Sequence, residues 1–326
     1  MLKMMDTTPP VMDAAPGANI RQSTNTVLMV RPHAFTPNPQ TAADNSFQCD
    51  TVKKDKATIA RQAYDEVSAM VALLQSKGIT VHLFEDDGQR GTPDSVFPNN
   101  WITTYNEGLI GVHAMYAKNR RKERRDDVLD FFQSHYNVLD IIDDSAAAEE
   151  GKYLEGTGVL ILDRLYKIAY MCRSMRTNEE LLEKYCRDFG FAAMAFDASD
   201  EGGTPIYHTN VMMCLGTNFA LIGLDCIKND HERARVVHML ESTGREIIEI
   251  SQDQIAAFAG NALELQGING KLLALSSTAF GALTNEQKAR IEQYAELLPI
   301  DIPTIELAGG SVRCMLAEIF LPVKVK

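Results

Sequence analysis

Two residues in this chain have the chemical types and the surroundings that cysteine-nucleophile chemistry requires. Cys314 follows the pair Gly309-Gly310 and stands at the head of an apolar run. The glycines allow the backbone to approach a ligand closely, and the adjacent Arg313 favours a thiolate. His208 opens another apolar run after a Gly-Gly-Thr-Pro loop, where a general acid or base can reach both solvent and substrate. A thiol and an imidazole that share one cavity can form and break covalent intermediates, so we expect these two residues to meet.

Each of the two residues also has a purely structural interpretation. A free cysteine is often a small buried hydrophobe, and we expect that role for the other cysteines of the chain: Cys49, Cys172, Cys186, Cys214 and Cys226. A histidine at the start of a strand is equally well satisfied by a backbone carbonyl. No pair of cysteines has C-x-x-C spacing, which argues against a zinc site and against a secreted disulfide framework. We therefore expect reduced thiols in a cytoplasmic protein that needs no metal and no other cofactor.

Two charged residues stand where a ligand or a structural partner is required. Glu155 lies at the start of an apolar run and is followed by Gly156, and burial of its carboxylate without a partner would be costly. We expect Glu155 to contact a cationic or amide-like ligand, or a structural cation. Arg176 precedes a helical pattern, and its guanidinium could hold a substrate carboxylate through two hydrogen bonds. The alternative for Arg176 is an ordinary surface arginine.

The elements that must position these residues alternate along the chain. Short apolar runs that begin beside Gly, Pro or Asn predict buried strands. They cover residues 27–32, 96–104, 154–162, 207–215, 261–266 and 312–321. Helical periodicity marks residues 57–76, 178–189, 231–242, 251–259 and 284–298. The alternation of strands and helices indicates an α/β fold.

The spacing of the predicted strands is nearly constant. The markers Phe97, Leu154, Tyr207, Gly260 and Val312 are separated by 57, 53, 53 and 52 residues. A period of this size predicts repeated units around a common centre rather than two unrelated domains. A doubly wound sheet is disfavoured, because no Gly-x-Gly-x-x-Gly follows a predicted strand. In a closed, propeller-like arrangement the starts of the strands converge, which would bring together Asn100, Glu155, His208 and Cys314.

The overall charge limits the classes of partner. The 326 residues carry 44 acidic and 32 basic side chains, a net charge of −12 that repels phosphate backbones and anionic membrane surfaces. We therefore expect neither nucleic acid nor membrane as a partner, and we interpret the basic run 118–125 as a solvated face. The acidic stretch 143–150 is predicted to be a loop. Residues 1–22 lack a continuous apolar region and are expected to form a flexible leader.

Together these segments resemble the guanidino-group-modifying superfamily, which comprises arginine deiminases, dimethylarginine dimethylaminohydrolases and amidinotransferases. Four motifs follow the family's order between about residues 27 and 321. They are Glu155-Gly156 for its acid-Gly-Gly strand, Ser174-x-Arg176-Thr177-Asn178 for its Ser-x-Arg-Thr-Asn signature, His208 for its catalytic histidine, and Gly309-Gly310 with Cys314 for its nucleophile segment. The resemblance implies a five-bladed, pseudo-symmetric α/β propeller (pentein) of repeated ββαβ units, formed as a single catalytic domain by residues 23–326.

Within the superfamily the chain looks closest to the arginine-deiminase-related branch linked with citrulline use. That branch carries elements matching Asn45-Ser46-Phe47-Gln48 and Phe97-Pro98-Asn99-Asn100-Trp101. The resemblance implies that the Cys314 thiolate attacks the central carbon of a guanidino or ureido group and that His208 protonates the departing nitrogen. It also implies that Glu155 holds the substrate nitrogens and Arg176 the α-carboxylate. Phe97 and Asn45 would line the same substrate site.

Two departures from the family pattern bear on the substrate. Arginine deiminases have aspartates where this chain has Asn100 and Asn210, and those carboxylates normally bind a guanidinium cation. Loss of both charges in a low-dielectric site weakens selection for a cation by roughly several kcal/mol. An amide offers a donor and an acceptor, which match the C=O and NH₂ of a urea. We therefore expect an amino-acid substrate with a neutral ureido group, such as citrulline, which would yield ornithine, ammonia and carbon dioxide.

Other functions remain compatible with these residues. The chain could be an arginine deiminase or a dimethylarginine dimethylaminohydrolase, or an amidinotransferase if an amine replaces water as the acceptor. A non-catalytic binding protein on the same fold is disfavoured, because Cys314, His208 and Glu155 are present together. A homo-oligomer is compatible with the sequence but is not indicated by it.

Overall fold

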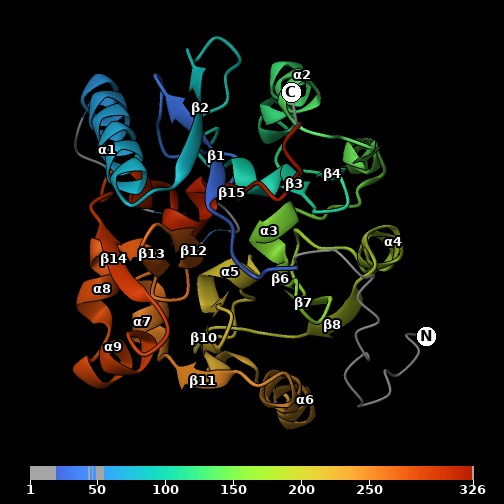
Figure 1. Ribbon diagram of the computed structural model, residues 1–326, viewed down its shortest axis with the longest axis vertical. Coiled ribbons are helices and arrows are strands. Elements are labelled where there is room, and N and C mark those ends of the chain that lie inside the picture. Colours follow the sequence, from blue (N-terminus) through green and yellow to red (C-terminus); the bar gives the residue numbers. More distant parts are fainter. Residues whose placement is uncertain (1–19, 43–44, 46, 49–54, 325–326) are drawn as a thin grey trace.

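In the computed structural model, the described residues (20–42, 45, 47, 48 and 55–324) form five sheets of three strands each. Figure 1 shows the sheets placed around a common centre, near which the short helices α3 (Gly156–Val159) and α5 (Thr209–Met212) lie. In chain order the strands are β1 (Thr26–Pro32), β2 (Thr80–Asp86), β3 (Ile102–Thr104), β4 (Leu109–Val112), β5 (Asp140–Asp143), β6 (Ile161–Asp163), β7 (Ile168–Cys172), β8 (Ala192–Phe196), β9 (Met213–Leu215), β10 (Phe219–Ile222), β11 (Glu246–Glu249), β12 (Leu263–Gly267), β13 (Gly270–Ser276), β14 (Glu296–Ile300) and β15 (Ala317–Glu318).

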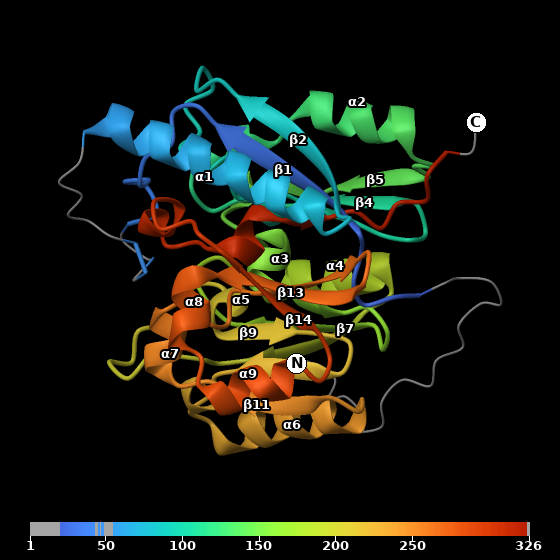
Figure 2. The ribbon, with the colours of Figure 1, turned by 60° about the vertical axis from the view of Figure 1, so that its left-hand side comes forward.

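All five sheets share one topology. The middle strand pairs antiparallel with one neighbour and parallel with the other, in the orders β15-β1-β2, β3-β4-β5, β6-β7-β8, β9-β10-β11 and β12-β13-β14. A parallel pair requires a crossover, and in each sheet helix connects the two parallel strands. The crossover helices are α1 (Lys56–Ser76), α2 (Asp126–His135), α4 (Glu179–Phe189), α6 (Asp230–Ser242), and α8 (Ser277–Ala282) followed by α9 (Asn285–Ile291). These helices lie on the outside of the molecule (Figures 1 and 2).

Local sequence explains the best-defined helices. In α1 the Asp55 side chain accepts a hydrogen bond from the Thr58 amide, which caps the first turn. Its buried face consists of the apolar residues that recur every three or four positions: Ile59, Ala63, Val67, Met70, Val71 and Leu74. Helix α4 begins after the capping residue Asn178 and ends at Gly190 in the left-handed conformation. The α/β class predicted from the sequence is confirmed.

The predicted strands are shorter than expected because several of them begin with a helical turn. Residues 96–104, 154–162, 207–215 and 312–321 start with η1 (Pro98–Asn100), α3, α5 and η6 (Val312–Met315) before β3, β6, β9 and β15. At these positions the chain has not yet joined its sheet, so hydrogen bonds within the turn satisfy the backbone. The Leu160 amide, for example, donates to the Gly156 carbonyl over 3.0 Å. The strand prediction was therefore wrong for the turn residues, which include Asn100, Asn210 and Cys314.

Two other predicted elements also differ from the structure. The helix expected over 284–298 ends at Ile291, and Glu296–Ile300 forms β14 because Leu297 and Leu298 are buried beside β13. The helix expected over 251–259 is only α7 (Gln252–Ala256), followed by Phe258 at a φ of 63°.

The acidic stretch 143–150 was also predicted incorrectly. It is not a loop but the end of β5 followed by the 3₁₀ helix η3 (Ser145–Glu150). Of the expected leader, residues 1–19 lie outside the described residues, and so does Cys49. None of the helices in the described ranges is long and apolar enough to cross a membrane.

A buried histidine makes the fold sensitive to acid. His113 is 4% exposed, its Nε2 lies 2.8 Å from Thr103 Oγ1, and burial lowers its pKa from 6.5 to about 4. The unfolded chain therefore binds more protons than the folded chain between these two values. As pH falls from about 6.5 to about 4, the neutral His113 costs the fold about 2 to 3 kcal/mol. The free energy of unfolding, measured with urea at pH 7 and pH 4.5, should fall less on acidification for His113→Gln than for wild type. An equal fall in both proteins would contradict this.

Candidate active site

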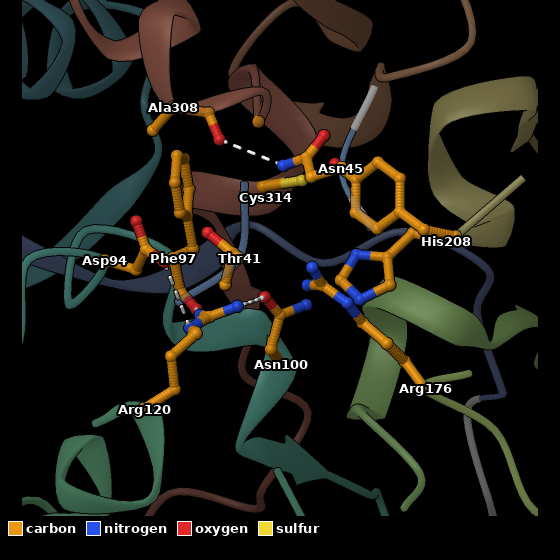
Figure 3. A pocket seen from close by; sticks show the side chains of 12 residues that line it. Thr41, Asn45, Asp94, Phe97, Asn100, Arg120, Arg176, His208, Ala308 and Cys314 are labelled. Atoms are coloured by element: carbon orange, nitrogen blue, oxygen red, sulfur yellow. Dashed lines mark hydrogen bonds and ion pairs between the residues drawn. The ribbon is translucent and has the colours of Figure 1, made fainter. Parts of the chain in front are cut away.

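Side chains that are far apart in the sequence converge on one pocket (Figure 3). Its lining residues are Thr41, Asn45, Asp94, Phe97, Asn100, Arg120, Arg176, Tyr207, His208, Ala308, Gly310 and Cys314. The expected meeting of Cys314 and His208 therefore occurs, with the sulfur and the imidazole on the wall of the same cavity. Asn100, Phe97, Asn45 and Arg176 join them, whereas Glu155 and Asn210 lie behind the wall.

The nucleophile candidate sits in the turn η6 and is hydrogen-bonded by two amides. Cys314 is 3% exposed, and its Sγ lies 3.3 Å from Asn210 Nδ2 and 3.2 Å from Asn261 Nδ2. The Cys314 amide donates to the Ser311 carbonyl over 3.0 Å, which shapes the turn. Gly310 lies directly against the Phe97 ring, since a Cβ added to this glycine would lie 2.8 Å from it. The sulfur can thus face a ligand while accepting hydrogen bonds from behind.

The orientation of His208 is set by a buried carboxylate. His208 Nε2 lies 2.8 Å from Glu155 Oε2. An ionised carboxylate only accepts hydrogen bonds, so Nε2 carries the proton and Nδ1 keeps a lone pair. A Cβ added to Gly158 would lie 2.9 Å from this Nδ1, which shows how closely α3 supports the ring. Burial lowers the pKa of His208 to about 4, although Glu155 acts in the opposite direction. At neutral pH the imidazole is therefore neutral.

Glu155 is fully buried and its oxygens are occupied by the protein. Oε1 accepts from the Tyr116 amide over 2.8 Å, and Oε2 faces His208 and Arg176 Nη1, the latter at 3.4 Å. Burial disfavours the carboxylate, but Arg176, His208 and Arg120 together hold the pKa of Glu155 below its usual range. Because Glu155 does not line the pocket, the predicted contact between this residue and substrate nitrogens does not fit the geometry. Its position suits an orienting role toward His208.

Arg176 is a pocket residue rather than a surface arginine. It is 2% exposed, and its guanidinium carbon lies 4.7 Å from the centre of the Tyr207 ring. Its backbone amide donates to Ser174 Oγ, which holds the start of the Ser-x-Arg-Thr-Asn segment in a turn. The Tyr207 hydroxyl in turn donates to the Gly309 carbonyl over 2.6 Å. The segment with Arg176 is therefore tied to the loop that precedes the nucleophile.

The amide of Asn100 has a fixed orientation. Arg120 Nη1 donates to Asn100 Oδ1 over 2.8 Å, and a guanidinium can only donate, so the oxygen must face Arg120. Asn100 Nδ2 then points away from Arg120, and it has no hydrogen-bond partner among the described residues. A Cβ added to Gly158 would lie 2.2 Å from this nitrogen, so Asn100 Nδ2 and the His208 ring meet over the same glycine. Asn100 thus offers the pocket a donor rather than an acceptor.

Arg120 contradicts the prediction that its basic run is solvated, and it lies in the pocket together with Asp94. The basic run 118–125 is not a wholly solvated face, because Arg120 is 2% exposed and forms a two-point ion pair with Glu123 at 2.9 Å. The carboxylates of Glu123 and Asp94 compensate the positive charge of the buried Arg120 guanidinium. Asp94 lines the pocket, and its Oδ2 accepts from Asn38 Nδ2 over 2.7 Å, while Oδ1 has no partner in the described part of the chain. Neither residue was identified from the sequence.

The two remaining candidates have structural contacts. Asn45 lines the pocket, but its Nδ2 donates to the Ala308 carbonyl and its Oδ1 accepts from the Phe47 amide, both over 3.1 Å. Its amide therefore joins two loops rather than facing a ligand. Asn210 Nδ2 lies between Cys314 Sγ and the Thr157 carbonyl, at 3.3 Å from each. Asn210 thus contacts the nucleophile, not the cavity.

Asn261 is a further site residue that was not predicted from the sequence, although the repeat pointed to it. Glu155, His208, Asn261 and Cys314 are each separated by 53 residues, and they occupy equivalent places at the starts of consecutive units. The repeat was noted from Gly260, one position before. Had a polar residue been sought at every position of the 53-residue repeat, Asn261 would have been included among the converging residues.

Comparison with known proteins agrees with this geometry. Residues 31–321 match the family described as N,N dimethylarginine dimethylhydrolase, eukaryotic. The chain belongs to this family. Membership confirms the predicted guanidino-group-modifying superfamily and the predicted enzyme class, a hydrolase acting on carbon–nitrogen bonds. No curated protein sequence matches the chain significantly.

Solved structures show the same fold at low sequence identity. The N-terminal domain of ArgZ with bound substrate, an arginine dihydrolase from the ornithine–ammonia cycle in cyanobacteria, matches with a TM-score of 0.67 and 16% identity, covering 91% of this chain and 99% of that one. Unliganded AgrE matches with a TM-score of 0.70 and 17% identity, over 92% of this chain but 40% of AgrE. A dimethylarginine dimethylaminohydrolase mutant carrying an S-methyl-L-thiocitrulline adduct matches with a TM-score of 0.60 and 15% identity, over 90% and 98% of the two chains.

The described part of the chain contains no group of three or more His, Cys, Asp or Glu residues that could hold a metal ion.

The described cysteines other than Cys314, which are Cys172, Cys186, Cys214 and Cys226, are free. Burial raises the pKa of the Cys172, Cys186 and Cys214 thiols to about 12, and that of Cys226 to about 11. These four thiols therefore remain protonated at neutral pH. Cys172, Cys214 and Cys226 are buried as expected, whereas Cys186 is only partly buried.

Proposed function

We propose that this protein hydrolyses the ureido group of an α-amino acid of the citrulline type through a covalent Cys314 intermediate. The five sheets of equal topology around one centre support a five-bladed α/β propeller as the scaffold, formed as a single catalytic domain. The family match and the shared pocket of Cys314 and His208 support the cysteine-dependent chemistry.

The orientation of Asn100 carries the choice of substrate. A guanidinium group has only N–H donors, so the unpartnered Nδ2 of Asn100 would face it donor against donor. A ureido group has a carbonyl oxygen that accepts this donor. The hydrogen bond from Arg120 keeps the amide from turning over. The site therefore favours a C=O where an arginine-type substrate has a C=NH₂⁺.

The other end of the pocket suits an α-amino acid. Asp94 Oδ1 is a buried acceptor without a protein partner, and an α-ammonium would supply both a donor and a compensating charge. Burial raises the pKa of Asp94 while Arg120 and Asn38 lower it, so a bound ammonium would further favour the carboxylate. Arg176 supplies the cation for the α-carboxylate. Such a zwitterionic clamp would hold the ureido group toward Cys314.

The proposed reaction has two halves. The Cys314 thiol proton passes to His208 Nδ1, and the thiolate forms a bond to the ureido carbon while Asn100 Nδ2 donates to the developing oxyanion. The C–NH₂ bond then breaks, and the nitrogen leaves as ammonia with the proton from His208. Water next gives a proton to His208 and adds to the carbon, the C–S bond breaks, and the released carbamate decomposes to ornithine and carbon dioxide. Glu155 keeps the imidazole in the orientation that serves both halves.

Substrate preference tests this proposal. Wild type should show a higher kcat/KM for citrulline than for arginine or N-methylated arginines, measured as ammonia and ornithine release. In Asn100→Asp a carboxylate oxygen replaces Nδ2, so the citrulline-to-arginine ratio of kcat/KM should fall about 100-fold or more. Asn99→Asp is the matched control, because Asn99 does not line the pocket, and its ratio should stay unchanged. A wild type that prefers arginine would contradict the neutral-substrate proposal.

Whether water or an amine accepts the carbon group is checked in the same assay. Water as the acceptor predicts that added amines do not divert the product. Cys314 as the nucleophile and His208 as the acid–base group serve in either case. An amine-dependent product would make the protein a transferase.

A further inference from the structure

The carboxamides behind the nucleophile form an arrangement that substrate binding does not explain. Asn210 and Asn261 are both fully buried, neither lines the pocket, and both direct Nδ2 at the Cys314 sulfur from 3.3 and 3.2 Å. They belong to adjacent units of the fold and meet on one atom. We propose that Asn210 and Asn261 form a pair of amide donors that stabilises the thiolate of Cys314, which makes Asn261 a positioning residue of the reaction. This inference rests on the proposed role of Cys314 as the nucleophile.

The orientation of both amides is fixed by other groups. Asn261 Oδ1 lies 3.4 Å from the Cys314 backbone N–H, which can only donate, so the oxygen must face the backbone and Nδ2 must face the sulfur. Asn261 Nδ2 also reaches the Asn210 carbonyl at 3.1 Å. Asn210 Nδ2 reaches the Thr157 carbonyl, an acceptor, at 3.3 Å. Neither amide can therefore turn over without placing an oxygen against an acceptor.

Two N–H groups discriminate between the thiol and the thiolate. A thiol sulfur is a weak acceptor, whereas a thiolate is an anion, and hydrogen bonds to an ionised acceptor are roughly twice as strong as neutral ones. The stabilisation is needed because burial lowers the pKa of His208 to about 4, which makes its imidazole a weak base. An aspartate at position 210 or 261 would have the opposite effect, since it would place a carboxylate against the sulfur.

Other charged or titratable groups also surround the sulfur and bear on its ionisation. Those lining the same pocket are Asp94, Arg120, Arg176, Tyr207 and His208. They remain in place when only an amide is changed, so a comparison of amide variants isolates the two donors. Asn261→Asp is especially informative, because the oxygen that accepts from the Cys314 backbone is kept, while the donor is replaced by a negatively charged oxygen.

The test is the pH dependence of Cys314 alkylation by iodoacetamide in the full-length protein, with the signal of Cys314→Ala subtracted. Asn261→Asp and Asn210→Asp should each shift the alkylation profile to higher pH by about one unit, which lowers the rate at pH 7 about tenfold. Asn261→Ser, which replaces the amide donor by a shorter hydroxyl and adds no charge, should shift it in the same direction by less. Asn229→Asp, a distant helix-capping amide, is the matched control and should leave the profile unchanged.

Superimposable profiles for wild type, Asn261→Asp and Asn261→Ser would overturn the proposal. Circular dichroism and urea unfolding of each variant identify any variant that fails to fold, and Asn261→Ser then decides the outcome. Alkylation needs no substrate, so it separates this inference from the proposed function. If the protein does not hydrolyse citrulline but its variants show the shifted profiles, the proposed role of the amide pair stands and only the proposed substrate is wrong.

Discussion

Cys314→Ala should lose turnover of the preferred substrate by a factor of about 10⁴ or more while still binding it. The sulfur is the only atom in the proposed reaction that forms a covalent bond to the substrate carbon, so no neighbouring group can replace it. The pocket that holds the α-amino and α-carboxylate groups does not depend on the sulfur. Ammonia release measures the first effect, and calorimetry with citrulline measures the second.

A second cysteine provides the matched control for this experiment. Cys186 lies on α4, is only partly exposed and is remote from the pocket, so Cys186→Ser should keep wild-type kcat/KM. Full activity in Cys314→Ala would exclude covalent catalysis. Loss of binding together with turnover would instead show that the substitution disturbs the pocket.

His208→Gln should reduce kcat about 10³-fold, the middle of the range for loss of a general acid–base group. Glutamine can still donate to Glu155, so the buried carboxylate keeps a partner, but it cannot carry a proton between sulfur, leaving nitrogen and water. Both halves of the reaction need that transfer, and hydrolysis of the intermediate is expected to be slowed most. Single-turnover kinetics with citrulline measure the two steps separately.

The exposed His238 on α6 gives the control for His208→Gln. It is distant from the pocket, and His238→Gln should retain wild-type rates. Substitution of Glu155 by glutamine should act through the same imidazole and give a smaller loss, since Glu155 orients His208 rather than contacting the substrate. Equal kcat values for wild type and His208→Gln would remove the proton-transfer role.

Residue types and spacing predicted the α/β class and the meeting of Cys314 with His208. Helices with a complete pattern were also recovered: α1 has both its capping Asp55 and an uninterrupted apolar stripe, so local signals agree there. The period near 53 residues reflects the repeated sheet topology. Predictions from the sequence were therefore most reliable where one local pattern was sufficient to define an element.

The parts that were wrong depend on contacts between distant residues. Arg120 pairs with Glu123 in its own run, but its burial also depends on the carboxylate of Asp94, which lies 26 positions earlier and whose proximity the sequence does not show. Likewise, Glu155 was assigned to the substrate because the sequence does not show that His208, Arg176 and the Tyr116 amide already occupy its oxygens. The orientation of Asn100 also became visible only with Arg120 beside it.

The central claim is that Cys314 bonds covalently to the carbon of a neutral ureido group, and intact-protein mass spectrometry tests it most directly. His208→Gln incubated with citrulline and quenched in acid should gain the mass of citrulline less one ammonia. Peptide mapping should place the added mass on Cys314, and the Cys314→Ala, His208→Gln double variant should gain nothing. An unmodified Cys314 under conditions in which wild type turns citrulline over would contradict the account.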